Sequence, residues 1–342
     1  MLRSLRRAAT VSLVLPLSFA LGAFAVSPGA ASAQEAHALI LVGIGGGDEY
    51  AQRFHEWASG LAGALVERHG LAGDNVTYLG EHAEADGSSR RADVEAALGA
   101  LVSRAGPDDQ VLVVIFGHGT ARGDEALVNL PGPDVSATEL GELLAPLTTQ
   151  RVAVVNTTSS SGPFVEALSG PSRTVITATR TAQERNETWF GQYFAQAYTG
   201  EDADLDKDGR VSLLEAYRYA TREVARHYEE QGLLMTEHAL IDDNGDHEGS
   251  SEPVVDPAEA GDGRLAGAFA FGRLGTVNPA NVDDPVLRGL LEERAALERR
   301  LDALRARQAS MAPEAYDAEL ETLLIEIALK DQEIRRRGGG GR

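Results

Sequence analysis

Twelve residues near the middle of the chain carry oxygen donors at the spacing of a calcium-binding loop. Residues 204–215 read DLDKDGRVSLLE. In such a loop the first, third and fifth positions supply carboxylate oxygens, a glycine in sixth place permits a sharp turn, and the twelfth position closes the shell with a bidentate carboxylate. The pattern predicts a calcium ion held by Asp204, Asp206, Asp208, the carbonyl oxygen of Arg210, Ser212 through water, and Glu215.

Helical patterns flank this loop and predict an EF-hand inserted at residues 188–228. The apolar positions that indicate the two helices are Trp189, Phe190, Tyr193 and Phe194 before the loop, and Leu213, Leu214, Tyr217 and Val224 after it. A second acidic run at 242–246 lacks the full spacing and is either an auxiliary oxygen cluster or a solvated turn. A single loop has no second site to cooperate with, which favours a structural role for calcium over a sensor role.

A second set of chemically capable residues follows two apolar runs. Residues 111–120 read VLVVIFGHGT and present His118, and residues 151–164 read RVAVVNTTSSSGPF and present Ser159. Functional groups of an open parallel sheet collect beyond the carboxyl ends of its strands, so we expect these two side chains to be neighbours. An imidazole beside a hydroxyl can serve as a base for a nucleophile. Equally, His118 could hold turn geometry, and residues 159–161 could hydrogen-bond the loop and the helix start at Pro163.

Apolar runs of strand length alternate with helix-like stretches along the chain, as in a parallel sheet with crossover helices. The fold class predicted is therefore α/β, with a mostly parallel six-stranded sheet covered by helices on both faces. The expected strands are 38–43, 75–79, 111–116, 152–156, 174–179 and 265–271. Helices are expected at 50–68 and 92–104, and Ser136 with Glu139 forms a capping box ahead of another. The polar stretch 247–263 indicates a surface loop.

The C-terminal part of the chain has a seven-residue repeat of apolar side chains. Leu290, Leu297, Leu304 and Met311 fall seven apart, and a second helix restarts at Pro313. We expect an antiparallel helical hairpin or coiled coil over residues 284–337. It is either a cap packed on the sheet domain or an arm that forms a homo-oligomer through residues 286–336.

The segments IFGHG at 115–119 and TTSSSGPF at 157–164 resemble the caspase-like and legumain-like cysteine peptidases. In those enzymes the third strand ends in His-Gly and the fourth in Ala-Cys-x-Ser-Gly. The resemblance covers residues 36–275 and implies a caspase-haemoglobinase fold, in which His118 acts on the leaving group. It also places Ser159 where the family has its catalytic cysteine.

The missing thiol changes the chemistry that the resemblance implies. The chain contains no cysteine, and a hydroxyl, unlike a thiol, needs a hydrogen-bonded base to become nucleophilic. We therefore expect a catalytically impaired pseudo-peptidase that acts as a binding or regulatory module. One alternative is a serine-type hydrolase using Ser159 and His118, although GxSxG is absent. Another is a structural protein that oligomerises through its C-terminal helices.

Ligand binding is expected at the cleft beyond the strand ends. Arg180 and Arg185 follow the fifth predicted strand and could hold a carboxylate of a peptide or protein ligand, or pair with surface acids. The glycine run 43–47 lacks the third glycine of GxGxxG and the GK[ST] of a P-loop, which weighs against nucleotide binding.

The first 33 residues have the pattern of a secretory leader: three arginines, an apolar stretch, and Ala31, Ser32 and Ala33. Cleavage after Ala33 would give a secreted or periplasmic protein without stable membrane insertion; the alternative is a permanent anchor. The mature chain would keep 28 basic and 52 acidic residues, a formal net charge of −24. Such a charge repels nucleic acid and anionic membranes. Absence of cysteine excludes disulfides and thiolate metal sites.

Overall fold

A computed structural model describes residues 35–123, 125–254, 261–272, 278–306 and 311–338. The predicted leader at 1–33 and part of the predicted loop at 247–263 lie outside these residues. Within the described ranges, no helix has the length and apolar character needed to cross a lipid bilayer.

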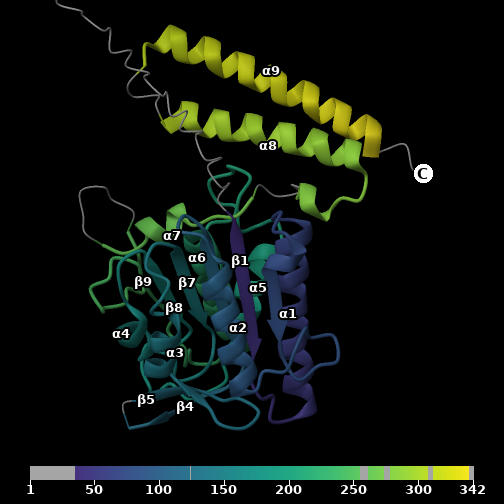
Figure 1. The fold of residues 1–342 in the computed structure, drawn as a ribbon. Helices are drawn as coiled ribbons and strands as arrows, with labels where there is room; N and C mark the ends of the chain where they lie inside the picture. The colour runs from purple at the N-terminus through teal and green to yellow at the C-terminus, as the bar shows by residue number, and fades with distance from the viewer. Residues whose placement is uncertain (1–34, 124, 255–260, 273–277, 307–310, 339–342) are drawn as a thin grey trace, which may run out of the picture. The chain divides into compact units, whose positions relative to one another are not determined.

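The centre of the fold is a six-stranded sheet with the order β2-β1-β3-β7-β8-β9 (Figure 1). The first five strands in this order pair in parallel, and β9 runs antiparallel to β8. The predicted mostly parallel six-stranded sheet is confirmed. Its strands are β1 (Ala36–Val42), β2 (Val76–Leu79), β3 (Gln110–Phe116), β7 (Arg151–Asn156), β8 (Arg173–Thr177) and β9 (Leu240–Asp242).

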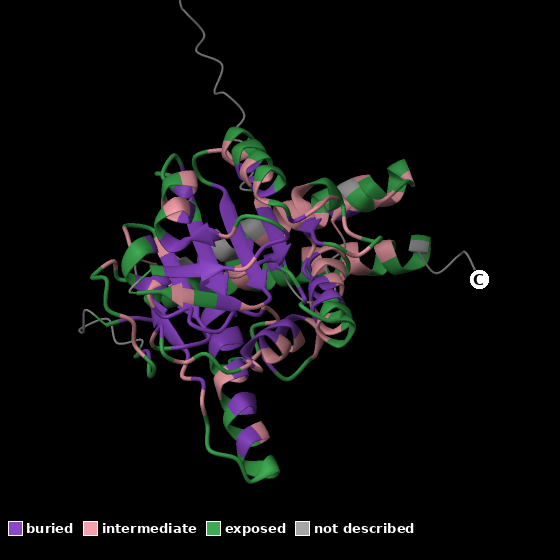
Figure 2. Ribbon diagram, turned by 90° about the horizontal axis from the view of Figure 1, so that it is seen from below, coloured by how far each residue is buried: buried purple, intermediate pink, exposed green. Residues whose placement is uncertain are grey.

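Helices cover both faces of this sheet, as predicted. One face packs against α1 (Asp48–Glu67), α5 (Phe190–Thr199) and α6 (Leu213–Gln231), and the other against α2 (Arg91–Arg104), α3 (Ala137–Leu144) and α4 (Phe164–Leu168). Successive strand residues point to opposite faces, so Ile40 and Leu41 enter different cores. The strands of this sheet are mostly buried along their length (Figure 2).

The prediction that the sixth strand spans 265–271 is wrong. Most of this segment forms the short helix α7 (Arg264–Ala268). The carboxylate of Asp243 accepts hydrogen bonds from the backbone N–H groups of Gly263, at 2.8 Å, and Ala266, at 2.7 Å. These bonds satisfy donors in the first turn of a helix, and they explain why the apolar run coils. The sixth strand is instead β9, which comes earlier in the chain.

A small antiparallel sheet follows β3 and was not predicted. It consists of β4 (Gly119–Arg122), β5 (Glu125–Val128) and β6 (Val135–Ser136). The sheet leads directly into the predicted capping box. Ser136 Oγ accepts from the Glu139 N–H at 3.2 Å, and the Glu139 carboxylate accepts from the Ser136 N–H at 2.9 Å. This box starts α3, as the sequence predicts.

The C-terminal residues form the predicted helical hairpin, α8 (Pro285–Ala306) and α9 (Pro313–Gly338). Leu301, Leu304, Tyr316 and Leu323 form a buried apolar cluster between these helices. Ion pairs also join the two helices, with Arg300 to Glu326 at 3.3 Å and Lys330 to Glu293 at 2.6 Å. The short helices η1 (Gly73–Asn75) and η2 (Pro279–Asn281) complete the named elements.

Candidate functional site

His118 stands directly after β3, and its ring packs against helix α1. The ring centroids of Tyr50 and Phe54 lie 4.9 and 5.2 Å from that of His118, both in edge-on geometry. In the described part of the chain, no hydrogen bond or ion pair reaches the imidazole. No described carboxylate therefore orients His118 as the third group of a catalytic triad would.

Ser159 is held by the backbone of the residue that follows His118. Its side chain is buried, and Oγ donates to the carbonyl oxygen of Gly119 at 3.0 Å while accepting from the Gly119 N–H at 3.3 Å. The ends of β3 and β7 thus meet, as the sequence predicts. However, the hydroxyl proton goes to a carbonyl oxygen, which cannot act as a general base.

Position 119 admits only glycine because of this close approach. A Cβ atom on Gly119 would lie 2.2 Å from the carbonyl oxygen of Ser159 and 2.5 Å from Thr158 Oγ1. Cβ atoms in folded proteins essentially never come this close to another atom, so a larger residue would push the two strand ends apart. The glycine after His118 therefore has a packing role.

The two serines that follow are also buried and serve the loop. Ser161 Oγ lies 3.1 Å from Thr179 Oγ1 and accepts the Thr179 N–H at 3.2 Å. Ser160 has a positive φ of 56°, and its N–H donates to the Glu184 carbonyl oxygen at 2.8 Å. Such a backbone conformation costs energy for a residue other than glycine and marks a tightly constrained turn. Pro163 precedes α4 as expected.

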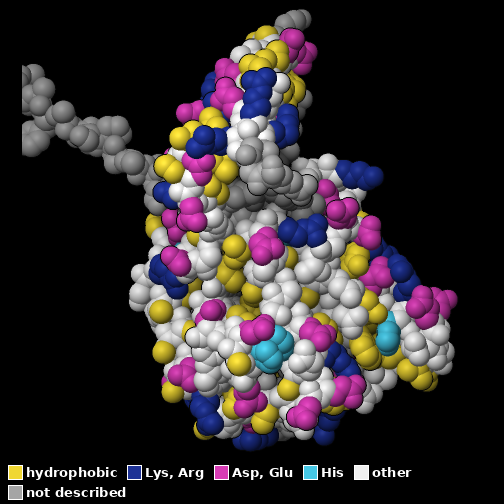
Figure 3. All heavy atoms as spheres, turned by 90° about the vertical axis from the view of Figure 1, so that its right-hand side faces the viewer, with side chains coloured by type: hydrophobic (Ala, Val, Ile, Leu, Met, Phe, Trp, Pro, Cys, Tyr) yellow, Lys and Arg dark blue, Asp and Glu magenta, His cyan; other side chains and the backbone are white. Residues whose placement is uncertain are grey.

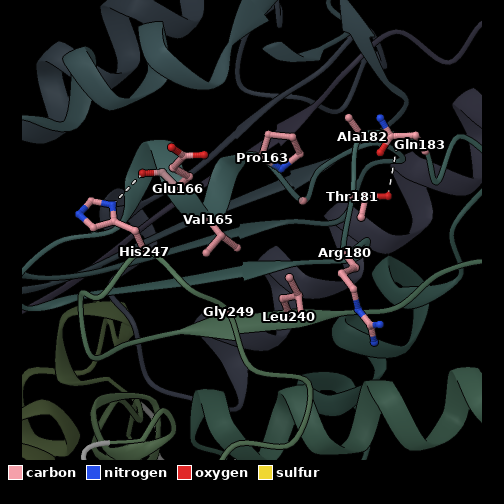
Figure 4. Close-up of a pocket in the computed structure, with 11 residues that line it drawn as sticks. Pro163, Val165, Glu166, Arg180, Thr181, Ala182, Gln183, Leu240, His247 and Gly249 are labelled. Atoms are coloured by element: carbon pink, nitrogen blue, oxygen red, sulfur yellow. Dashed lines mark hydrogen bonds between the residues drawn. The ribbon is translucent and has the colours of Figure 1, made fainter. Parts of the chain in front are cut away.

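A cavity of about 380 Å³ lies beside this turn (Figure 4). Arg180 and His247 stand on opposite sides of it, and Val165 and Leu240 lie between them. His247 Nδ1 lies 2.9 Å from the carbonyl oxygen of Glu166. The Arg180 guanidinium forms no ion pair with any described residue, and it also lines a neighbouring cavity of about 250 Å³. Arg180 is therefore available to a carboxylate; Arg185 does not line either cavity.

The loop at 204–215 brings its first three acidic side chains together. Carboxylate oxygens of Asp204, Asp206 and Asp208 all lie within 4.8 Å of one another. Positive φ angles at Lys207, 59°, and Gly209, 83°, turn the chain tightly around them. Asp204 Oδ2 accepts the Gly209 N–H at 3.0 Å, but Oδ1 of the same carboxylate is buried without a hydrogen-bond partner among the described residues.

The twelfth loop residue, Glu215, reaches back to the start of the loop. One carboxylate oxygen accepts the Leu205 N–H at 2.8 Å. The other accepts the Ser212 N–H at 2.8 Å and the Ser212 hydroxyl at 2.7 Å. Ser212 in turn accepts the Glu215 N–H and so caps α6. Arg210 donates its N–H to Asp208 Oδ1 at 2.8 Å, so every predicted ligand residue belongs to one hydrogen-bonded loop.

The electrostatics of the loop fit a hard cation. The Asp208 N–H lowers the pKa of the Asp206 carboxyl, but burial and the charges of Asp208, Glu215 and Asp204 outweigh it and leave that pKa raised. Like charges gathered at this distance repel, and a divalent ion relieves the repulsion. An unsatisfied buried oxygen on Asp204 points to the same need. The donor set consists of oxygen atoms, which Ca²⁺ prefers.

The loop pairs with a segment of the sheet domain. Ser212 forms an antiparallel bridge with Ala270, and the Leu213 N–H donates to the Phe269 carbonyl oxygen at 2.9 Å. The acidic run at 242–246 lies elsewhere and is only partly solvated. Asp242 and Asp243 are buried and their carboxylates accept backbone N–H groups, whereas Asn244 and Asp246 are exposed at the tip of the turn.

Sequence reasoning missed a buried acid at the start of α5. Glu237 is only 2% exposed, and its carboxylate accepts the N–H groups of Trp189, at 2.8 Å, and Phe190, at 3.0 Å. Burial raises the pKa of Glu237 to about 7, against the opposing effect of these bonds. The residue lies in an irregular segment between α6 and β9, where no periodic pattern could have identified it.

Comparisons with known proteins found likeness among solved structures. No protein-family model matches the chain, and no curated protein sequence matches it. Among solved structures the chain is similar to the Drosophila initiator caspase Dronc, with a TM-score of 0.40 and 13% sequence identity. The match covers 63% of this chain and 81% of that one.

Proposed function

We propose that the chain is an exported calcium-binding protein whose caspase-like domain is a catalytically impaired pseudo-peptidase that binds a peptide or protein ligand. Three parts make up this proposal: calcium at 204–215, a silenced strand-end site, and a ligand cleft near Arg180. Export rests on the leader pattern at 1–33. N-terminal sequencing of the secreted protein tests export, and a mature chain starting at Gln34 is expected.

The observation that carries the calcium assignment is the buried, unpartnered Oδ1 of Asp204 beside the carboxylates of Asp206 and Asp208. Buried oxygens without hydrogen-bond donors are rare, and a bound cation accounts for this one. Glu215 holds the twelfth place of the loop, which supplies the bidentate ligand in loops of this type. The loop connects α5 and α6, so calcium would fix the geometry of both helices on their face of the sheet.

The resemblance to a peptidase site extends to the positions of His118 and Ser159 but not to the activation of one by the other. Strands β3 and β7 are the third and fourth strands of the main sheet along the chain, and His118 and Ser159 follow them as the resemblance requires. The Ser159 proton is committed to the Gly119 carbonyl oxygen, and the His118 ring is packed on α1. Neither group activates the other in this arrangement, so the cleft binds without cleaving.

Arg180 gives the cleft its chemical preference. Its guanidinium forms no ion pair within the described structure and borders two cavities. A guanidinium pairs with carboxylates through two parallel hydrogen bonds. We therefore expect a peptide with an acidic side chain or a free C-terminus, and the change Arg180→Gln should abolish its binding while Arg185→Gln leaves it intact.

Calcium binding is tested by thermal and chemical unfolding in calcium and in chelator. Calcium at a hundredfold excess over its dissociation constant should raise the free energy of unfolding by about 2.7 kcal/mol. Asp204→Asn should abolish this increase, because the amide removes one charge and keeps the acceptor for the Gly209 N–H. The matched control is Asp317→Asn on the exposed surface of α9. An equal melting temperature with and without millimolar calcium would refute the assignment.

A further inference from the structure

A cluster of two histidines and a glutamate lies between α1 and the segment after β2. His55 projects from α1 and is 6% exposed, while His82 and Glu84 follow β2. One ligand atom from each of the three residues lies within 4.8 Å of the other two. On the molecular face of Figure 3, histidine and acidic side chains lie next to each other. Neither the calcium loop nor the strand-end cleft uses these residues.

The distance between His55 Nε2 and the Glu84 carboxylate fits a tetrahedral metal site. His55 Nε2 lies 3.3 Å from the Glu84 carboxylate. In tetrahedral geometry, two ligand atoms at about 2.0–2.1 Å from zinc lie about 3.3–3.4 Å apart. The two atoms therefore stand at the separation that a shared ion requires, and no large movement of the buried His55 is needed.

Tyr78 provides the support that a metal-binding histidine needs. Its hydroxyl lies 3.1 Å from His55 Nδ1, and Tyr78 is buried. In the tautomer of neutral His55 with the proton on Nδ1, this N–H donates to the phenol oxygen of Tyr78. The Nε2 atom then directs its lone pair toward Glu84. Ligating histidines are usually fixed by such a second hydrogen bond.

We propose that His55, His82 and Glu84 bind a divalent transition metal ion, with Zn²⁺ as the ion their donor set suits best. Imidazole nitrogen with one carboxylate favours such ions over calcium, which prefers an all-oxygen shell. The ion fastens the segment after β2 to helix α1. A cavity of about 270 Å³ borders the cluster and has room for a water molecule as fourth ligand.

Metal binding requires one local rearrangement. The rings of His55 and His82 are stacked, with centroids 3.5 Å apart and planes inclined by 16°. A metal bound by imidazole lies near the plane of the ring, so one ion cannot lie in the planes of two stacked rings. His82 must therefore rotate out of the stack, whereas His55, held by Tyr78, stays in place.

Cobalt titration of the full-length protein in millimolar Ca²⁺ tests the proposal. Calcium occupies the oxygen site, and Co²⁺ serves as a spectroscopic substitute for zinc. We expect one equivalent to bind with the visible absorption of a tetrahedral ion, and Zn²⁺ to displace it. His82→Asn should abolish the absorption, and Tyr78→Phe should weaken binding by about tenfold to a hundredfold.

Two control variants keep the test decisive. His247→Asn removes a histidine outside the cluster at a positive φ of 69°, which asparagine tolerates. Tyr228→Phe removes a hydroxyl that contacts Thr236 instead of a histidine. Both should bind cobalt like the unmodified protein. Octahedral cobalt absorption, no binding, or equal binding by His82→Asn would each overturn the proposal, and circular dichroism confirms that every variant is folded.

Discussion

The hydroxyl of Ser159 donates its hydrogen bond to the carbonyl oxygen of Gly119, 3.0 Å away, and the imidazole of the preceding His118 is turned to the aromatic rings of α1. The ends of β3 and β7 are therefore joined through the backbone. Ser159 connects the end of β7 to the end of β3 through two hydrogen bonds, and this structural role accounts for the burial of its side chain.

The first prediction concerns the reactivity of Ser159. A fluorophosphonate probe should leave the serine unlabelled, because no base accepts its proton; peptide mass spectrometry of the treated protein gives the readout. A labelled Ser159 would establish the serine-hydrolase alternative. Ser159→Ala should lower the free energy of unfolding by about 1 kcal/mol through loss of the hydrogen bond. The exposed Ser103→Ala in α2 serves as control and should change it by less than about 0.5 kcal/mol.

The second prediction concerns the close approach at Gly119. Gly119→Ala should destabilise the protein by about 3 kcal/mol or more, because its Cβ would overlap the Ser159 carbonyl oxygen. Gly63→Ala in the middle of α1 is the matched control, since nothing lies within 4 Å of the added methyl group. That change should stabilise the protein by roughly 0.5–1 kcal/mol. Equal urea midpoints for the two variants would contradict the packing role of Gly119.

The third prediction is a pH dependence that comes from Glu237. The pKa of Glu237 is about 7 in the folded protein and lies near its ordinary value of 4.5 in the unfolded chain. Between pH 4.5 and 7, Glu237 is therefore protonated in the folded state and ionised in the unfolded state. Stability therefore falls as pH rises from about 4.5 to 7 and levels off above that range. Glu237 should contribute about 3 kcal/mol to this fall.

Urea unfolding at pH 5 and pH 8 measures the effect of Glu237. Glu237→Gln should lose less stability than the unmodified protein between these two values, because the amide does not titrate. The exposed Glu67→Gln should keep the original difference. If Glu237→Gln showed the same difference in stability between pH 5 and pH 8 as the unmodified protein, the pKa of Glu237 would not be raised in the folded protein.

The fourth prediction addresses the C-terminal hairpin. Helix α9 exposes Leu324, Ile325 and Leu329 at 46%, 52% and 57%. Exposed apolar side chains gathered on one helix favour a second copy of the chain as partner. Light scattering should show an oligomer that the double change Ile325→Lys, Leu329→Lys converts to a monomer. Leu234→Lys, at a residue 90% exposed outside the hairpin, should not alter the mass. A monomeric unmodified protein would exclude this arm.

The sequence was most informative where a single pattern dominates. The five parallel strands were predicted because helices on both faces make each strand apolar throughout, as Val111–Phe116 shows. Ser136 and Glu139 predicted a helix start that the structure confirms, because both partners of the capping box are local in sequence. The hairpin helices were likewise predictable from the spacing of Leu297 and Leu304.

The sequence failed where distant residues decide the outcome. The run 265–271 is apolar enough for a strand, but Asp243, more than 20 residues earlier, caps it as a helix. Strand β9 has only three residues, too few for a periodic signal. In the candidate sites, the residues of the acidic loop could be named because they are consecutive. The cluster of His55, His82 and Glu84 joins two separate elements, so only the structure brings it together.

The antiparallel bridge between Ser212 and Ala270 pairs the acidic loop with another segment of the same chain. In paired calcium loops each loop orders the other, so calcium binding to one loop raises the calcium affinity of the other. Here the companion segment at 269–271 has no acidic residue and is not a second calcium loop, so calcium binding at 204–215 should follow a simple hyperbola without a sigmoidal phase. Under the proposed calcium assignment, the loop would stay filled wherever calcium is well above its dissociation constant, and it would lack the steep, switch-like response that two cooperating loops give.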